Sequence, residues 1–519
     1  MTKPQKDNLF ILIRSLTKSE KRQFKLYIGR LGVNEDSKFL LLFKVMEKLK
    51  LYNEQAILKE GFVKKQQLSN LKAHLYKQIL ISLRLNPSHQ NLRIQLREQL
   101  DFATILYHKG LYKQSLKILD KAKAQAITNQ EKNIAYEIVE LEKVVESQYI
   151  TRSLSNRADE LTVQAKMLSR QNLIASKLSN LSLQLYGLFL KTGYVKNDTE
   201  YQNVTNYFNK RMPKFELKEL GFREKLWLYK SYLWYSFLVQ DFKSCYKYSK
   251  KWVDLFYDNE PMIRLNPVFF LRGYQYLLEA LFFVKHHKKF KTVLSELEQI
   301  VLKSWFPRDE NIDGLVFLYV YSNKINLHFI QGTFKEGLPL INEVVAGLKT
   351  HSDQVDEHHV MVFYYKIASL YFGTEDYVNA IKYLSKIINN KSLQMREDLL
   401  CFSRILNLVA HYEAGEDYEL DRLIKNTYKF LIKMEDLYAV QREMVAFLRK
   451  LGDIYPHQLK AAFKSLLQKL LTYENHPYER RAFLYLDIIS WLESKIENKS
   501  TADIIREKFT KLTQVYYFF

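Results

Sequence analysis

One acidic segment has the residue types of a calcium-binding loop. Residues 309–314 read Asp-Glu-Asn-Ile-Asp-Gly, with oxygen-bearing side chains where such a loop begins. A calcium loop closes with a bidentate glutamate at its twelfth position, and here that position is Val320. We therefore expect this segment to be a turn that caps a helix.

Other residues with catalytic or metal-binding chemistry are scattered. His351, His358 and His359 lie near several carboxylates but lack the spacing of a metal site, so we expect solvated histidines. The sequence contains none of the motifs GxxxxGKS/T, HExxH, CxxC or GxSxG. We therefore expect no catalytic, cofactor-binding or metal-binding residues, and a protein that is not an enzyme.

Composition favours helices over sheets. The 519 residues are 47% hydrophobic, enough for a large core, but include only 15 glycines and 9 prolines. A sheet protein needs many more turn residues than this. Two cysteines, Cys245 and Cys401, indicate a reducing compartment rather than a disulfide framework. No apolar run has the length of a signal peptide or of a membrane span, which predicts a soluble cytoplasmic protein without membrane contacts.

Positive charge is concentrated near the N-terminus. The formal net charge is +22, and residues 1–100 hold 20 lysines and arginines against 8 acidic residues. The other 419 residues carry 59 basic and 49 acidic residues. Such a basic segment suggests a nucleic acid or an acidic protein as partner. The alternative is a lysine-rich surface that keeps the protein soluble.

The N-terminal segment is expected to form short helices. Thr17 to Glu20 has the pattern of a capping box, and further helices are predicted over 39–49, 55–59 and 64–85. Gly61 between the last two suggests a DNA-binding helix-turn-helix, but Ala56 is one position too far from it. The alternative is a helical cap that covers the end of a repeat array.

A pair of helices is predicted over Tyr364–Asn389. Tyr364, Ile367, Ala368 and Tyr371 share a helical face, and Ala380 and Leu384 follow a short polar turn. The two alanines are expected where the helix backbones approach most closely. The segment resembles a tetratricopeptide repeat, although Tyr stands for Trp, Ile-Ala for Leu-Gly and Leu for Phe, and the final proline is absent.

The same pattern recurs along the chain at a regular interval. The residues that follow each predicted inter-helix turn are 112, 155, 201, 242, 290, 334, 377 and 418, separated by 41 to 48 residues. A tetratricopeptide repeat has 34 residues, so each helix is expected to be about one turn longer. The units at 155 and 201 match the pattern poorly. Ala461-Ala462 and Ile504-Ile505 continue the spacing, which predicts hairpins to the end of the chain.

Aromatic and basic residues alternate in Trp227–Tyr257. Such a stretch could stack nucleic-acid bases, but in a helical array most of these rings are expected to fill the core. Residues 285–289, Lys-His-His-Lys-Lys, are expected to be a solvated inter-helix turn.

These observations predict an all-α protein. A basic helical module at residues 1–86 precedes an α-solenoid of about ten hairpins at residues 91–519. The expected function is that of a cytoplasmic scaffold or adaptor that binds a protein segment, and an acidic segment is one candidate. No cofactor is expected. The alternative is a regulator that contacts nucleic acid through residues 1–86.

The resemblance to tetratricopeptide proteins implies a concave groove lined by the first helix of each hairpin. Counting from Tyr229, Leu277, Tyr321 and Tyr364, the positions one and five further on should face it, which include Leu278 and Ser322. Lys285, eight positions past Leu277, is added to them. The predicted partner-binding residues are Lys230, Trp234, Phe282, Lys285, Asn326, Tyr365 and Ser369. The alternative is that longer helices shift these positions, so that Trp234 and Phe282 pack between hairpins.

Overall fold

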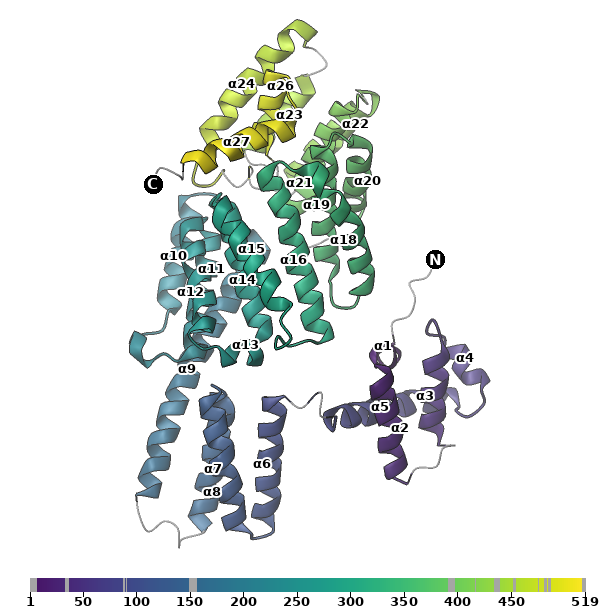
Figure 1. Ribbon diagram of the computed structural model, residues 1–519, viewed down its shortest axis with the longest axis vertical. Helices are drawn as coiled ribbons and strands as arrows, with labels where there is room; N and C mark the ends of the chain where they lie inside the picture. The colour runs from purple at the N-terminus through teal and green to yellow at the C-terminus, as the bar shows by residue number, and fades with distance from the viewer. Residues whose placement is uncertain are drawn as a thin grey trace. The chain divides into compact units, whose positions relative to one another are not determined.

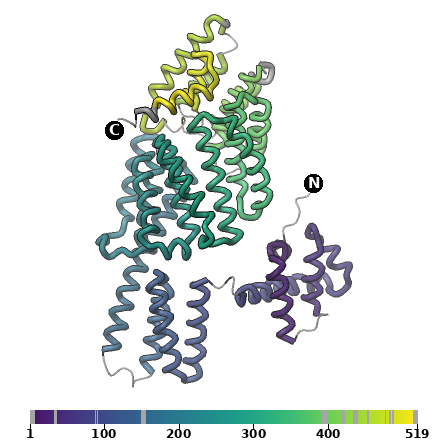
Figure 2. The backbone as a smooth tube through the Cα atoms, in the orientation of Figure 1, coloured from purple at the N-terminus to yellow at the C-terminus, as the bar shows by residue number. Residues whose placement is uncertain are grey.

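The computed structural model is all-helical. It describes residues 7–32, 37–86, 89, 91–148, 156–390, 397–415, 417–433, 439–450, 454–474, 476–479, 483 and 487–515. No strand occurs among these residues, and consecutive helices pack against each other in pairs (Figure 2). The chain divides into two compact units, Met1–Leu168 and Ser169–Phe519.

The first unit has two separate hydrophobic cores, one formed by residues 9–79 and one by residues 96–168. The domain boundary expected after residue 86 stays a prediction, because Pro87, Ser88 and Gln90 lie outside the described residues. The helices of this unit are α1 (Asn8–Ser15), α2 (Lys18–Arg30), α3 (Lys38–Lys48), α4 (Glu54–Lys59), α5 (Lys65–Arg84), α6 (Leu92–His108), α7 (Tyr112–Thr128), α8 (Lys132–Gln148) and the beginning of α9 (Arg157–Thr192).

The N-terminal helices form where the sequence predicts them. The capping box at the start of α2 is complete, because Thr17 Oγ1 accepts from the amide of Glu20 and the Glu20 carboxylate accepts from the amide of Thr17. Phe24 and Phe43 are buried in the core formed by residues 9–79, with ring centroids 4.9 Å apart. Gly61 has a φ of +77°, a left-handed conformation that glycine adopts easily, in the turn between α4 and α5.

The second unit comprises the remainder of α9, α10 (Asp198–Arg211), η3 (Leu217–Glu219), α11 (Phe222–Leu238), α12 (Phe242–Tyr257), α13 (Pro261–Leu265), α14 (Pro267–Phe283), α15 (His287–Val301), α16 (Glu310–Gln331), α17 (Phe334–Gly337), α18 (Pro339–Thr350), α19 (Glu357–Gly373), α20 (Tyr377–Ile388), α21 (Glu397–Glu413), α22 (Asp417–Lys433), α23 (Ala439–Lys450), α24 (Pro456–Glu474), α26 (Ile488–Glu497) and α27 (Thr501–Val515). Figure 1 shows their order.

Several of the predicted inter-helix turns lie at the expected positions. Four of the aromatic landmarks are the first residues of a helix, namely Tyr112, Phe242, Phe334 and Tyr377. In the α19–α20 hairpin, Ala368 and Ala380 are both fully buried, as expected for the contact between its helices. The acidic segment at 309 is a helix cap, because Asp309 Oδ1 accepts from the amide of Ile312.

One expected turn is missing. The weak units at 155 and 201 predicted a break between them, but α9 continues without interruption for 36 residues. The physical reason is that residues 157–192 contain no proline and only one glycine, Gly187, so nothing ends the helix. Position 155 itself lies outside the described residues, whereas Tyr201 lies in the first turn of α10.

Aromatic side chains fill the core around α11–α15. Trp252 is fully buried and donates from Nε1 to the carbonyl of Phe269 at 3.1 Å. A Cβ added to Gly273 would lie 3.0 Å from Cδ1 of this ring, so glycine allows the close contact between α12 and α14. The core interpretation of Trp227–Tyr257 is therefore confirmed for Trp234 and Trp252.

The last helices return to earlier parts of the second unit. α27 packs against α16 (Figure 1), and Arg506 Nε donates to the carbonyl of Gly332 at 3.1 Å. Before α26, the Tyr478 hydroxyl donates to Asp198 at 2.6 Å. Helices therefore contact partners well beyond their immediate neighbours, which a period in the sequence cannot predict. None of the described helices combines the length and apolar character needed to cross a bilayer.

Candidate functional site

A groove of about 620 Å³ opens on the second unit, and we call it the central groove. Its walls come mainly from α14, α16 and α19, with further side chains from α9, α11 and α21. These helices include the first helix of several hairpins, the position that the tetratricopeptide resemblance implies. The groove is defined here by Tyr186, Trp234, Tyr276, Phe282, Tyr319, Asn326, Phe363 and Lys366.

Aromatic rings form one wall of the central groove. Trp234 lies 4.7 Å from the ring of Tyr186, 5.4 Å from that of Phe189 and 5.5 Å from that of Tyr276, measured between centroids. Only 5% of Trp234 is exposed, so its neighbours hold the ring in place. Such a rigid apolar wall can accept an anchoring side chain at little entropic cost.

Lys366 brings a positive charge into this aromatic groove. It projects from α19, where its ammonium donates to Oδ1 of Asn326 and lies 5.9 Å from the centroid of Phe329. Burial lowers the pKa of Lys366 to about 8, although Glu279 favours the charged form. An anionic group that entered the groove would pair with an ammonium that has lost much of its hydration.

Carboxylates and histidines lie at another part of the same groove. Asp356 begins α19, where its Oδ1 accepts from the amide of His359 at 2.9 Å and lies 2.9 Å from the His359 ring. These hydrogen bonds and the nearby histidine hold the pKa of Asp356 below its usual value despite partial burial. Glu357 and His358 also line the groove, so its charge is mixed.

Two tyrosines remain neutral donors inside the groove. Burial raises the pKa of Tyr276 and of Tyr319, and Arg272 opposes the shift at both. Their hydroxyl groups therefore keep their protons at neutral pH. The groove thus offers hydrogen-bond donors in addition to its rings and its lysine.

A second, smaller cavity of about 220 Å³ lies where the C-terminal helices meet α14, α16 and α19. We call it the C-terminal pocket, and it is lined by Phe282, Lys285, His287, Ser369, Glu474 and Phe509 among others. The Lys285 ammonium lies 3.6 Å from the Glu474 carboxylate. Burial and neighbouring cations lower the pKa of His287 to about 4, so this side chain is not the solvated histidine expected in that turn.

Most of the predicted partner-binding residues line these two cavities. Trp234, Asn326 and Tyr365 line the central groove, Lys285 and Ser369 line the C-terminal pocket, and Phe282 contributes to both. Ser322, which the same counting selects, also lines the central groove. Whether any of them contacts a partner stays a prediction.

Several predicted positions differ from the exposure expected of them. Lys230 lines neither cavity, and its ammonium lies 4.7 Å from the Trp227 ring and 5.7 Å from the Phe269 ring. Burial lowers its pKa to about 8. Tyr365 is only 5% exposed and Leu278 is fully buried, because these helices pack on more than one side.

Lys366, Glu279 and Tyr276 also line the central groove, although the helical spacing did not single them out. A signal for the lysine exists, since Lys366 is the single charged residue in the apolar run 360–373 of α19. Among the residues that the structure describes, no three side chains of His, Cys, Asp or Glu come together as a metal site would require.

Comparisons with known proteins do not assign the chain to a family. No family model matches it, and neither a curated protein nor a solved structure does. The likeness to tetratricopeptide repeats therefore rests on the quoted residues and on the packed helix pairs.

Proposed function

We propose that the protein is an interaction scaffold or adaptor in the cytoplasm whose central groove holds a segment of a partner protein. On this proposal the helix pairs form an α-solenoid of the tetratricopeptide type, closed by the C-terminal helices. The observation that supports the proposal is Lys366, a partly desolvated cation among aromatic rings and neutral tyrosines. The matching segment carries a carboxylate flanked by apolar anchors.

Selection from a random peptide library tests this proposal. Ser322 lines the groove and is partly exposed, so Ser322→Arg would fill the groove without disturbing the core. Ser295→Arg on the exposed face of α15 makes the same chemical change outside both cavities. We expect enriched peptides with acidic and apolar residues, whose binding Ser322→Arg weakens at least about tenfold.

The control variant Ser295→Arg should leave peptide binding unchanged. The wild-type protein, Ser322→Arg and Ser295→Arg should have equal melting temperatures. Lys366→Met should reduce binding of the acidic peptides while keeping the volume of the side chain. The proposal fails if no peptide is enriched, or if Ser322→Arg and Ser295→Arg bind the enriched peptides equally well.

The basic N-terminal helices support a second candidate function, contact with nucleic acid. Lys18, Arg22, Lys44 and Lys65 are exposed on α2, α3 and α5. Changing all four to Glu should weaken binding of a 20-nucleotide single strand and reduce its salt dependence, by a slope of about 0.7 for each phosphate that the protein no longer neutralises. Unchanged binding and slope would show that these charges serve only solubility.

A further inference from the structure

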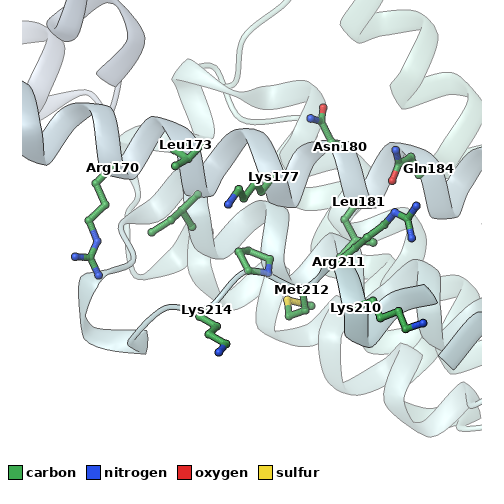
Figure 3. Close-up of a pocket in the computed structure, with 12 residues that line it drawn as sticks. Arg170, Leu173, Lys177, Asn180, Leu181, Gln184, Lys210, Arg211, Met212 and Lys214 are labelled. Carbon is green, nitrogen blue, oxygen red and sulfur yellow. The ribbon is translucent and has the colours of Figure 1, made fainter. Parts of the chain in front are cut away.

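A cationic trench lies between α9 and the end of α10, separate from the central groove. Its volume is about 680 Å³, and it shares no lining residue with the central groove or the C-terminal pocket. Five basic side chains line it, namely Arg170 and Lys177 from α9, and Lys210, Arg211 and Lys214 from the end of α10 and the loop after it. Figure 3 shows Arg170 and Arg211 at opposite ends, with Lys177 between them.

Most of this charge is not neutralised within the protein. Arg170 pairs with Glu219 at 2.9 Å, and the Arg211 guanidinium stacks 3.8 Å from the Tyr207 ring. Among the described residues, no carboxylate lies within ion-pair distance of Lys177, Lys210 or Lys214. All three lysines are exposed, so the trench presents an unpaired positive surface.

The floor of the trench is aliphatic. Leu173, Ile174 and Leu181 come from one face of α9, and Met212 and Pro213 come from the opposite side. Leu173 is 55% exposed and accessible to a partner, whereas Ile174 and Leu181 are buried. No aromatic ring is among the residues that line the trench, whereas sites for single-stranded nucleic acid stack bases on such rings.

The geometry points to an acidic amphipathic helix of a partner protein as the occupant of the cationic trench. Its apolar face would pack on the exposed Leu173 and on the half-buried Met212 and Pro213, and its carboxylates would pair with the lysines on both sides. The stretch of α9 from Arg170 to Gln184 spans about 21 Å at 1.5 Å per residue, the length of a helix of about 14 residues. Methionine in the floor adapts its shape to different apolar partners.

Fluorescence anisotropy with defined probes tests this assignment. The first probe is a labelled 15-residue peptide of Glu and Leu with the leucines at helical spacing. The second has the same composition with the leucines scrambled, and the third is a 15-nucleotide oligothymidylate. At 150 mM salt we expect the full-length protein to bind the helical peptide at least about tenfold more tightly than either of the others.

Charge reversal locates the binding surface. Lys177→Glu combined with Lys210→Glu should weaken binding of the helical peptide about tenfold or more. Lys243→Glu combined with Lys291→Glu changes the net charge equally at exposed positions outside the trench, and should change binding less than about twofold. Leu173→Asp should weaken binding as well, and it is safe for folding because the leucine is exposed.

Three results would overturn the assignment. Equal losses in the two charge-reversed proteins would show a nonspecific effect of net charge. Equal binding of the scrambled peptide would show that the aliphatic floor plays no part. Tighter binding of the oligothymidylate, lost on charge reversal in the trench, would make the occupant a nucleic acid. Ser322→Arg should leave trench binding unchanged, which separates this inference from the proposed function of the central groove.

Discussion

The helices α6–α8 and the helices α11–α15 solve the same packing problem with different side chains. In α6–α8 the interior is rich in alanine, with Ala103, Ala122 and Ala135 fully or almost fully buried. In α11–α15 it is filled by large rings such as Trp252 and Phe290. Both regions bring helix backbones close together, the first with small alanines and the second with interlocking rings and a glycine at the contact of α12 with α14.

The alanine-rich region also buries charge. Glu142 is fully buried on α8, where Lys123 contacts one of its oxygens at 2.5 Å and Arg157 the other at 3.3 Å. Burial raises the pKa of Glu142, and the two cations oppose that shift. A buried ion pair adds little net stability, but removing one partner is costly because the other charge is then left buried without it.

The central groove opens beside the aromatic region. Its lining includes the rings of Trp234, Tyr276 and Phe282 from α11 and α14. We expect the stability of the aromatic region to depend on how its large side chains fit together. The stability of the alanine-rich region should depend on its buried ion pairs.

The largest effect is expected from Trp252→Ala. Loss of a buried tryptophan costs about 3–5 kcal/mol, and here it also removes the hydrogen bond from the indole to the carbonyl of Phe269. Hydrogen exchange should accelerate in residues 222–301 and remain unchanged in residues 92–148. Uniform acceleration in both regions would contradict the view that their stabilities are independent.

Glu142→Ala should be nearly as damaging, by about 3 kcal/mol. It leaves two cations without their buried partner, although Asp120 and Glu146 still lie within 4.0 Å of them. Accelerated exchange is expected in residues 92–148 alone. The control is Glu140→Ala on the same helix, since its pair with Lys143 is exposed and worth less than about 1 kcal/mol. If Glu142→Ala and Glu140→Ala destabilise the protein equally, the buried ion pairs of Glu142 do not stabilise this region.

These two regions also show how much of the structure the sequence predicts. Helical period and turn residues locate the hairpins at Tyr112 and Phe242, because both are local properties. The buried state of Glu142 is not predictable, since its partners lie 15 and 19 residues away and a glutamate usually marks an exposed face.

The same limit applies to the candidate site. Counting helical positions found Trp234 and Asn326, since each helix faces the groove with a regular spacing. It could not find the contact between Lys285 and Glu474 in the C-terminal pocket, which are 189 residues apart. It also placed Lys230 in the groove, because counting along one helix ignores the side on which the next helix packs.

Gly273→Ala should have a smaller effect whose sign depends on Trp252. In the wild-type protein the new Cβ meets the locked ring at 3.0 Å, and overpacking of about 1–3 kcal/mol exceeds the roughly 1 kcal/mol that alanine gains in a helix. In the Trp252→Ala background the clash is gone. There the same change should stabilise the protein by up to about 1 kcal/mol, and a double-mutant cycle measures the reversal. Destabilisation in both backgrounds would show that the ring is not the obstacle.

A pH-dependent effect is expected from protonation of Lys366 in the central groove. Its folded pKa is lowered to about 8, below the value of about 10.4 for an unfolded lysine. Between these values the unfolded chain binds more protons, so this group makes the free energy of unfolding rise as pH increases from about 8 to about 10.4. Lys366→Met should remove that part of the rise.

Amine reactivity gives a direct measurement of the same pKa. At pH 8 about half of the Lys366 side chains should be neutral and nucleophilic, so a small acylating reagent should label Lys366 ahead of ordinary surface lysines. Lys230 should behave similarly, since its pKa is also lowered to about 8. A bound acidic peptide should protect Lys366 but leave Lys230, which lies outside the groove, equally reactive. Protection of both lysines would place the peptide elsewhere, and slow labelling of Lys366 without peptide would show that its ammonium keeps the pKa of a hydrated lysine.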